Sequence, residues 1–159
     1  MVIRGLQMVG MLMGRMYPET PIPAVGAFIL KDGKLLLVKR AYEPGAGKWT
    51  VPGGAIELGE KTVEALHREI LEEVGIRLKN VKLLDIYDAI FRDEGNRIRY
   101  HYVIIEFLAE PETMEVKLSD EALDYRWVNL EEVEHLDLTY SVRYMIKKYW
   151  GLFREFGKS

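Results

Sequence analysis

The sequence predicts an α/β protein in which a mixed β-sheet lies between helices, forming an α/β/α sandwich. Three observations favour this fold class. Strand-like runs occur on both sides of one short amphipathic helix, and a second amphipathic helix closes the chain. The strand predicted at residues 97–108 also carries bulky side chains on both of its faces. A sheet that is apolar on both faces has to be covered on both, so helical layers are expected above and below it.

The first two strands are predicted at residues 24–30 and 35–40. The four residues between them, Lys31-Asp32-Gly33-Lys34, contain an Asp-Gly pair. Aspartate and glycine accept the positive φ angles of a tight turn, so the two strands should form a β-hairpin.

The central helix is predicted at residues 63–74. Its apolar side chains recur at steps of three and four residues, as one helical face requires: Val63, Leu66, Ile70 and Val74. Thr62 is expected to cap the N-terminus, and Gly75 is expected to end the helix in a left-handed conformation.

Three more strands are predicted, at residues 81–91, 97–108 and 125–129, with a turn at residues 93–96. The chain then ends in one amphipathic helix. Its apolar positions at helical spacing are expected to pack in the core: Val142, Met145, Ile146, Tyr149, Trp150, Phe153 and Phe156.

Residues 1–16 are expected to form a loosely held N-terminal extension, and residues 17–159 a single domain. Glycines interrupt the methionine-rich start, so it lacks the long apolar region of a secretory signal. No run of about eighteen apolar residues exists for a membrane span. A packing or dimer role for the extension is the alternative.

The amino-acid composition limits the kinds of binding partner and the cellular compartment that are expected. The chain has 22 basic and 25 acidic residues and no long basic run, which argues against binding a nucleic-acid polymer. Cysteine is absent, which excludes disulfides, thiol catalysis and cysteine-ligated zinc. A reducing compartment fits this composition, and the cytoplasm is expected.

The predicted helix at residues 63–74 carries a cluster of carboxylates, Glu69, Glu72 and Glu73. Glu69 and Glu73 are four residues apart and should project side by side. Like charges at this spacing destabilise a helix unless a cation relieves them. Mg²⁺ prefers oxygen ligands and keeps waters that a phosphate can displace, so the cluster predicts a magnesium site, with Mn²⁺ as the alternative metal. A solvated acidic helix face is the simpler alternative for such a cluster alone.

Residues near the helix support the metal-site interpretation. Pro52-Gly53-Gly54 is expected to form a turn in which backbone can approach a ligand without a side chain in the way. Arg68 stands beside Glu69 and is placed to pair with Glu60 and hold the intervening loop.

This segment resembles the Nudix box, Gly-x5-Glu-x7-Arg-Glu-U-x-Glu-Glu-x-Gly-U, where U is a bulky aliphatic residue. Every defined position is filled, by Gly54, Glu60, Arg68, Glu69, Ile70, Glu72, Glu73, Gly75 and Ile76. The resemblance extends from Pro23 to the region of Trp127. It implies the Nudix-type α/β/α sandwich and a pyrophosphohydrolase that acts on phosphorus-containing acid anhydrides.

The resemblance also implies roles for the residues of the box. Glu69 and Glu73 would be the principal metal ligands, with Glu72 as a further ligand or a support of one. The backbone carbonyl of Gly53 would complete the set, and Arg68 and Glu60 would hold the loop in place.

A general base in many family members is a carboxylate on a later loop, ahead of a strand with a tryptophan. Here Ser119-Asp120-Glu121 precedes Arg126-Trp127. Glu121 is therefore predicted as the base in preference to Asp120, with Glu112 and Glu115 as alternatives.

The substrate implied by the resemblance is a small nucleotide, in which a nucleoside diphosphate is linked to another moiety. ADP-ribose, cleaved to AMP and ribose 5-phosphate, is the first choice, because residues 42–49 and the run Tyr100-His101-Tyr102 resemble small family members that act on ADP-ribose and nucleoside-diphosphate sugars. A nucleoside triphosphate, hydrolysed to cleanse the nucleotide pool, is the alternative. The alternative of another functional class is a nucleotide-binding module without catalytic activity. The resemblance to the family also suggests a homodimer.

A tryptophan and several basic residues could contact a nucleotide, but a purely structural or surface position is expected for them. Trp49 could stack on a base, but core packing is at least as good an interpretation. Several basic residues at strand ends could reach phosphates, although a solvated surface position is expected for each: Lys39, Arg40, Arg92, Arg97 and Arg99.

Overall fold

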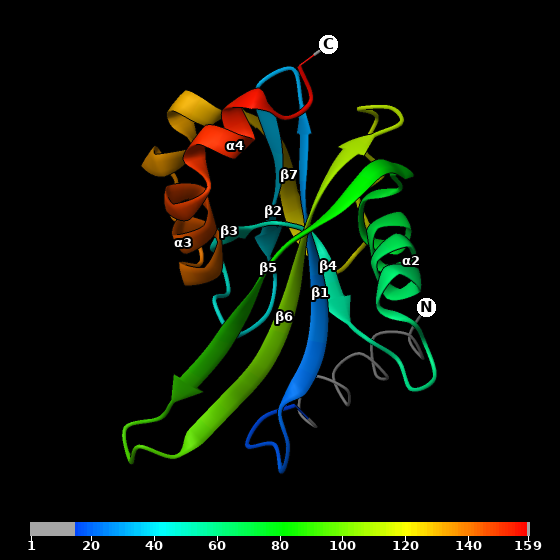
Figure 1. Cartoon of the computed structure of the whole chain (residues 1–159). Helices are drawn as coiled ribbons and strands as arrows, with labels where there is room; N and C mark the ends of the chain where they lie inside the picture. Colours follow the sequence, from blue (N-terminus) through cyan, green and yellow to red (C-terminus); the bar gives the residue numbers. More distant parts are fainter. Residues whose placement is uncertain (1–14, 159) are drawn as a thin grey trace.

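The computed structural model describes residues 15–158 and shows a seven-stranded mixed sheet with helices on both faces (Figure 1). The strands are β1 (Ile22–Lys31), β2 (Lys34–Arg40), β3 (Trp49–Thr50), β4 (Gly53–Ala55), β5 (Leu78–Arg92), β6 (Ile98–Pro111) and β7 (Ala122–Asn129). The helices are α2 (Thr62–Val74), the 3₁₀ helix η1 (Leu130–His135), α3 (Tyr140–Lys148) and α4 (Trp150–Glu155). The predicted fold class is confirmed. Residues 1–14 of the expected extension lie outside the described residues.

The sheet is built around β1, which pairs with strands on both sides. The strand order is β3-β2-β1-β6-β5, with β4 added to β1 and β7 added to β2. The β1–β6 pair is parallel and the other pairs are antiparallel. Parallel pairing of β1 with β6 requires a long crossover, and the segment that carries α2 and β5 supplies it.

The predicted hairpin between β1 and β2 is present, with Asp32 at φ 51° and Gly33 at φ 74°. The two strands are paired only beside this turn, at Leu30–Leu35 and Lys31–Lys34. Farther from the turn, β1 pairs with β4 and β6, whereas β2 pairs with β3 and β7. The strands therefore separate, and the cleft described below lies between their far ends.

Two apolar cores hold the layers together, one on each face of the sheet. On one face, Leu66 and Ile70 of α2 are fully buried against residues such as Ile29 of β1. On the other face, Phe153 of α4 stacks on Phe28 of β1 with ring centroids 5.2 Å apart. Neighbouring residues of β1 thus point into opposite cores, which explains why the strand is apolar throughout.

The central helix starts one residue earlier than predicted, and its cap differs. Thr62 is the first helical residue, and Lys61 is the N-cap. The Lys61 backbone N–H donates to Glu64 Oε2 at 3.3 Å, so a side chain of the first turn caps the helix in place of the threonine hydroxyl. Gly75 ends the helix in the left-handed region at φ 69°, as predicted.

The predicted single C-terminal helix is wrong in one respect, because the chain forms two helices that break at Tyr149. Tyr149 leaves the helical region with φ −114° and ψ 23°. Its hydroxyl donates to Asp85 Oδ2 of β5 at 2.5 Å, and Lys148 Nζ lies 2.9 Å from the same oxygen. The apolar helical periodicity continues through the break, so the sequence pattern alone does not predict it. Within residues 15–158, no helix is long and apolar enough to cross a membrane.

Candidate active site

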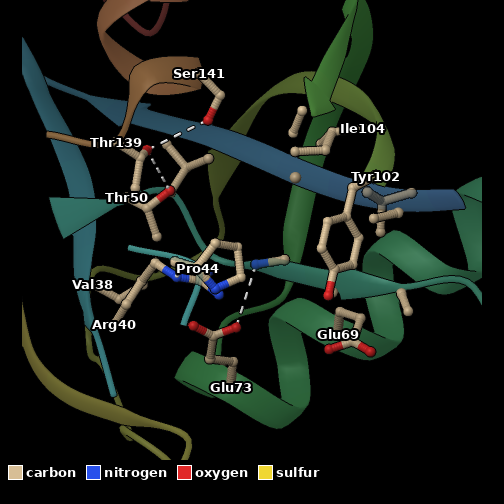
Figure 2. A pocket seen from close by; sticks show the side chains of 18 of the residues that line it. Val38, Arg40, Pro44, Thr50, Glu69, Glu73, Tyr102, Ile104, Thr139 and Ser141 are labelled. Carbon is tan, nitrogen blue, oxygen red and sulfur yellow. Dashed lines mark hydrogen bonds between the residues drawn. The ribbon is translucent and has the colours of Figure 1, made fainter. Parts of the chain in front are cut away.

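A cleft of about 570 Å³ opens between the separated ends of β1 and β2 (Figure 2). Its walls come from β1, β2, β4, α2, β5 and β6, and from the start of α3. A volume of this size is typical of a site for a small organic molecule. Residues 50, 139 and 141 line the α3 end, where Thr139 Oγ1 donates to Thr50 Oγ1 at 3.1 Å.

The carboxylates of α2 enter this cleft because the helix buries its apolar stripe elsewhere. Leu66, Ile70 and Val74 pack under the sheet, which turns the adjacent face of α2, with Glu69 and Glu73, toward β4 (Figure 2). Glu73 is only 8% exposed, and its Oε2 accepts a hydrogen bond from the Gly53 backbone N–H at 3.3 Å. The box therefore places two carboxylates in a largely desolvated position.

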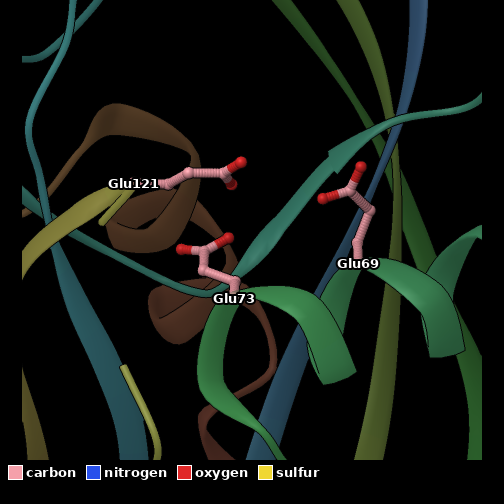
Figure 3. A group of neighbouring side chains, drawn as sticks. All are labelled: Glu69, Glu73 and Glu121. Carbon is pink, nitrogen blue, oxygen red and sulfur yellow. The ribbon is translucent and has the colours of Figure 1, made fainter. Parts of the chain in front are cut away.

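A third carboxylate joins them from a distant part of the chain. Glu121, just before β7, extends an exposed side chain toward Glu69 and Glu73 (Figure 3). One carboxylate oxygen from each of the three residues lies within 4.8 Å of the others. A single cation at the centre could contact all three groups.

Electrostatics of the cluster are unfavourable without a cation. Burial raises the pKa of Glu73 to about 8, and the charges of Glu121 and Glu69 add to this effect. Burial likewise raises the pKa of Glu69 to about 7, although Arg68 partly opposes it. Desolvated carboxylates close to one another hold protons more tightly because ionising them adds like charges. A divalent cation would replace those protons, so the donor set fits a metal site.

Two glycines make room for this arrangement. A Cβ atom on Gly54 would lie 2.4 Å from the carboxyl carbon of Glu69, and a Cβ on Gly53 would lie 2.1 Å from the carbonyl oxygen of Val25. A larger residue at position 54 would displace the Glu69 carboxylate, and one at position 53 would displace the backbone of β1. The expected Pro-Gly-Gly turn is instead the start of strand β4, paired with β1, so the glycines serve close strand and helix packing.

Arg68 links the loop before α2 to the carboxylates on it. Its guanidinium donates to both oxygens of Glu60, from Nε at 2.6 Å and from Nη2 at 3.0 Å. Nη2 also donates to the Ala55 carbonyl at 3.1 Å, and Nη1 donates to Glu69 Oε1 at 2.9 Å. The expected Arg68–Glu60 pair is therefore present, and it extends to a residue of the cluster. The hydrogen bonds from Arg68 hold the pKa of Glu60 down at about 2.

Glu72 lies apart from the three clustered carboxylates. It is exposed, and its Oε2 accepts a hydrogen bond from Arg68 Nη1 at 3.2 Å. This position suits a support of Arg68 more directly than a ligand in the cluster. Asp120, the alternative to Glu121, is outside the group of clustered carboxylates found among residues 15–158.

Three residues at the cleft were not predicted as part of a site. Arg40, expected at the solvated surface, is instead half-buried in the cleft wall, and its Nε donates to the Pro44 carbonyl at 2.6 Å. Tyr102 and Glu106 line the cleft from β6. The signal for Glu106 was present in the sequence, because it is the one charged residue in the otherwise apolar run from Val103 to Ala109. Trp49 is 8% exposed and belongs to the core.

Comparison with known proteins gives concordant results. The family model described as "NUDIX domain" matches residues 20–149. The ADP-ribose pyrophosphatase of Methanocaldococcus jannaschii is 37% identical over 116 residues, which cover 73% of this chain and 66% of that protein, just under two thirds of its length. Nucleoside triphosphatase NudI of Escherichia coli K12 is 35% identical over 123 residues, covering 72% of this chain and 86% of that protein.

Solved structures agree with the sequence matches. The crystal structure of a MutT NUDIX hydrolase from Burkholderia pseudomallei superposes with a TM-score of 0.69 at 34% identity, over 81% of this chain and 98% of that one. The strand order, the helix with its box and the sequence similarity all point to the same relationship. This chain belongs to the Nudix hydrolase family, as the box at residues 54–76 predicts.

Proposed function

We propose that this chain hydrolyses the pyrophosphate bond of ADP-ribose, with Mg²⁺, to give AMP and ribose 5-phosphate. The observation that carries the proposal is the group of three carboxylates, Glu69, Glu73 and Glu121, at one side of a cleft large enough for a nucleotide. The choice of ADP-ribose is supported by the relative from Methanocaldococcus jannaschii.

Glu69 and Glu73 are proposed to hold the metal with the Gly53 carbonyl. When bound, the metal would neutralise the diphosphate and polarise a phosphorus–oxygen bond. Gly53 donates its N–H to Glu73, which fixes the orientation of that carboxylate. Arg68 fixes Glu69 in the same way. Metal-ligating side chains that are already held in place lose little conformational freedom when the metal binds, so the free-energy cost of ordering them is small.

Glu121 is proposed to accept the proton of the attacking water. Its exposed side chain reaches the cluster from the solvent side of the cleft, where a water has access. The water oxygen would form a bond to one phosphorus while the bond from that phosphorus to the bridging oxygen breaks, and the bridging oxygen leaves with the other phosphate. Arg40, which also lines the cleft, would contribute positive charge to the phosphates.

A nucleoside triphosphate is the second candidate substrate. NudI, at 35% identity over 86% of its length, supports this alternative. Both substrates share a nucleotide and a pyrophosphate bond, so the cluster of carboxylates serves either. The cytoplasmic location and the homodimer expected from the sequence stay predictions.

The test is a magnesium-dependent panel that covers ADP-ribose, nucleotide sugars, dinucleoside polyphosphates, and normal and oxidised nucleoside triphosphates. Products are separated by chromatography and identified by mass. Formation of AMP and ribose 5-phosphate with the highest kcat/KM supports the first candidate. A monophosphate and pyrophosphate from a triphosphate would support the second. No turnover of any substrate by folded, metal-binding protein would favour a nucleotide-binding module.

A further inference from the structure

Glu106 is a carboxyl group buried at the cleft and unused by the proposed chemistry. It lies on β6 with 1% of its surface exposed. Residues alternate between the two faces of a strand, so Tyr102, Ile104 and Glu106 share the face that lines the cleft, while Ile105 and Phe107 pack in the core beside α2. A polar side chain thus replaces an apolar one at a single cleft-facing position.

The surroundings of Glu106 leave space for its carboxyl group but provide no partner for one of its oxygens. Within residues 15–158, no group donates a hydrogen bond to the buried Oε2. That oxygen lies over Gly26 of β1, where a Cβ atom would be 2.4 Å away. Glycine at position 26 is therefore needed to admit the carboxyl group. A buried polar atom without a partner costs free energy, so a role that repays this cost is expected.

The burial of Glu106 determines the charge of its carboxyl group and the hydrogen bonds that the group can form. An ionised carboxylate in this position would lack both water and a neighbouring cation, so the neutral acid is favoured. Burial raises the pKa of Glu106 to about 8, in agreement with this argument. A neutral carboxyl group offers one O–H donor beside one carbonyl acceptor. It can form two parallel hydrogen bonds with a group that has an acceptor next to a donor.

Glu106 lies in the same cleft as the carboxylate cluster, with strand β1 between it and β4. Gly53 of β4, Gly26 of β1 and Glu106 of β6 stand in register on adjacent strands. Two inter-strand spacings, about 10 Å, therefore separate the Cα atoms of Glu106 and Gly53, and the Glu106 carboxyl group reaches over Gly26 between them. Gly53 is hydrogen-bonded to Glu73 of the cluster, and both ends lie in the same cleft. A substrate whose phosphates bind at the cluster can extend along the cleft to Glu106.

We propose that Glu106 is a specificity-determining residue that hydrogen-bonds, as the neutral acid, to the edge of the substrate's nucleobase. Adenine suits this contact, because its 6-amino group donates and the adjacent ring nitrogen accepts. The inference rests on the proposed function in that it assumes a nucleotide in this cleft, but it does not depend on which nucleotide is hydrolysed.

The test measures binding of AMP and of ribose 5-phosphate, which lacks the base, by isothermal titration calorimetry. It compares the wild-type protein with Glu106→Gln, whose amide keeps one donor and one acceptor, and with Glu106→Leu, which has neither. The wild type should bind AMP at least about tenfold more tightly than ribose 5-phosphate. Glu106→Leu should weaken AMP binding by about tenfold to a hundredfold and leave ribose 5-phosphate unchanged, because only the base contact is lost. Glu106→Gln should stay within about threefold of the wild type.

Three results would overturn the inference. The wild type could bind AMP and ribose 5-phosphate equally well, or Glu106→Leu could bind AMP as tightly as the wild type. Glu106→Leu could also lose affinity for both ligands equally, which would indicate a structural role. If Glu106→Leu does not fold, the wild type is compared on AMP and on purine riboside 5′-monophosphate, which lacks the 6-amino group. About tenfold weaker binding of the second ligand supports the inference, and equal binding overturns it.

The substrate panel, run on the same protein, separates the two proposals. If the AMP results hold while ADP-ribose is not hydrolysed, the proposed substrate is wrong and the role of Glu106 stands. If ADP-ribose is hydrolysed while Glu106→Leu binds AMP normally, the role of Glu106 is wrong and the proposed function stands.

Discussion

Two glutamates at opposite ends of the Nudix box show how differently the fold treats the same side chain. Glu60, in the loop before α2, receives both arms of the Arg68 guanidinium, which hold its pKa at about 2. Glu73, in the last turn of α2, is buried near two other carboxylates, and burial raises its pKa to about 8. Glu60 is stabilised as an anion by Arg68, whereas Glu73 has no such cationic partner within residues 15–158 and needs a proton or a metal cation. The same short motif thus contains both a structural ion pair and a metal-binding group.

The strongest test of this contrast is Glu73→Gln. The amide keeps the size of the side chain but removes the negative charge that a metal requires, so kcat should fall by about 10³-fold or more. Without metal, the buried Glu73 carboxyl group is mainly protonated at neutral pH and carries no charge, like the glutamine amide. The melting temperature without metal should therefore change little. The readouts are magnesium-dependent turnover and the melting temperature. The control is Glu94→Gln, an exposed residue of the β5–β6 turn, and wild-type turnover by Glu73→Gln would refute the ligand assignment.

Glu121→Gln tests the third carboxylate of the cluster. We expect kcat to fall by about 10²-fold, the lower end of the range for a general base, because Glu121 is exposed and water can partly replace it. Metal affinity, measured by titration with Mn²⁺, should stay nearly unchanged. A large loss of metal affinity with this variant would instead make Glu121 a ligand, and an unchanged kcat would place the base elsewhere.

Arg68→Lys tests the ion pair that stabilises Glu60, the other glutamate of the comparison. Lysine keeps the charge but cannot bind both oxygens of Glu60 while also reaching Glu69 and the Ala55 carbonyl. Looser support of Glu69 should raise the magnesium concentration needed for half-maximal rate by about tenfold. The melting temperature should fall by about 2–4 °C, as expected for a loss of about 1 kcal/mol in a chain of this size. An unchanged magnesium requirement would mean that the network does not position Glu69.

Glu106→Gln gives the smallest expected effect and extends the comparison to a buried acid without a partner. The pKa of Glu106 is raised from 4.5 to about 8 by burial, so the folded state binds more protons than the unfolded state between these values. The stability of the wild type should therefore fall as pH rises through this window. Glutamine does not titrate, so the melting temperature of the variant relative to the wild type should be higher at pH 8 than at pH 5. A difference that is independent of pH would mean that Glu106 is not buried as the neutral acid.

The local features of the box could be predicted because they depend on residues close together in the sequence. The helix stripe, the left-handed Gly75 and the Arg68–Glu60 pair all follow from spacings of a few residues. Local signals were less accurate at the ends of helices. The first turn of α2 is capped through Glu64, and Tyr149, where the C-terminal helix breaks, is hydrogen-bonded to Asp85, 64 residues away.

The sequence by itself determined the enzyme family, the α/β/α layers and the two carboxylates that enter the cleft from α2. The resemblance to the family had also pointed to Glu121, but how Glu121 and Glu106 reach the site was decided by the tertiary structure alone. Glu121 reaches the cluster because the segment before β7 passes beside α2, and Ser119 N–H donates to the Glu73 carbonyl at 2.9 Å. Glu106 enters the cleft because parallel pairing places it beside Gly26. The physical reason is that helical period and capping are properties of neighbouring residues, whereas strand register and burial depend on contacts between distant ones.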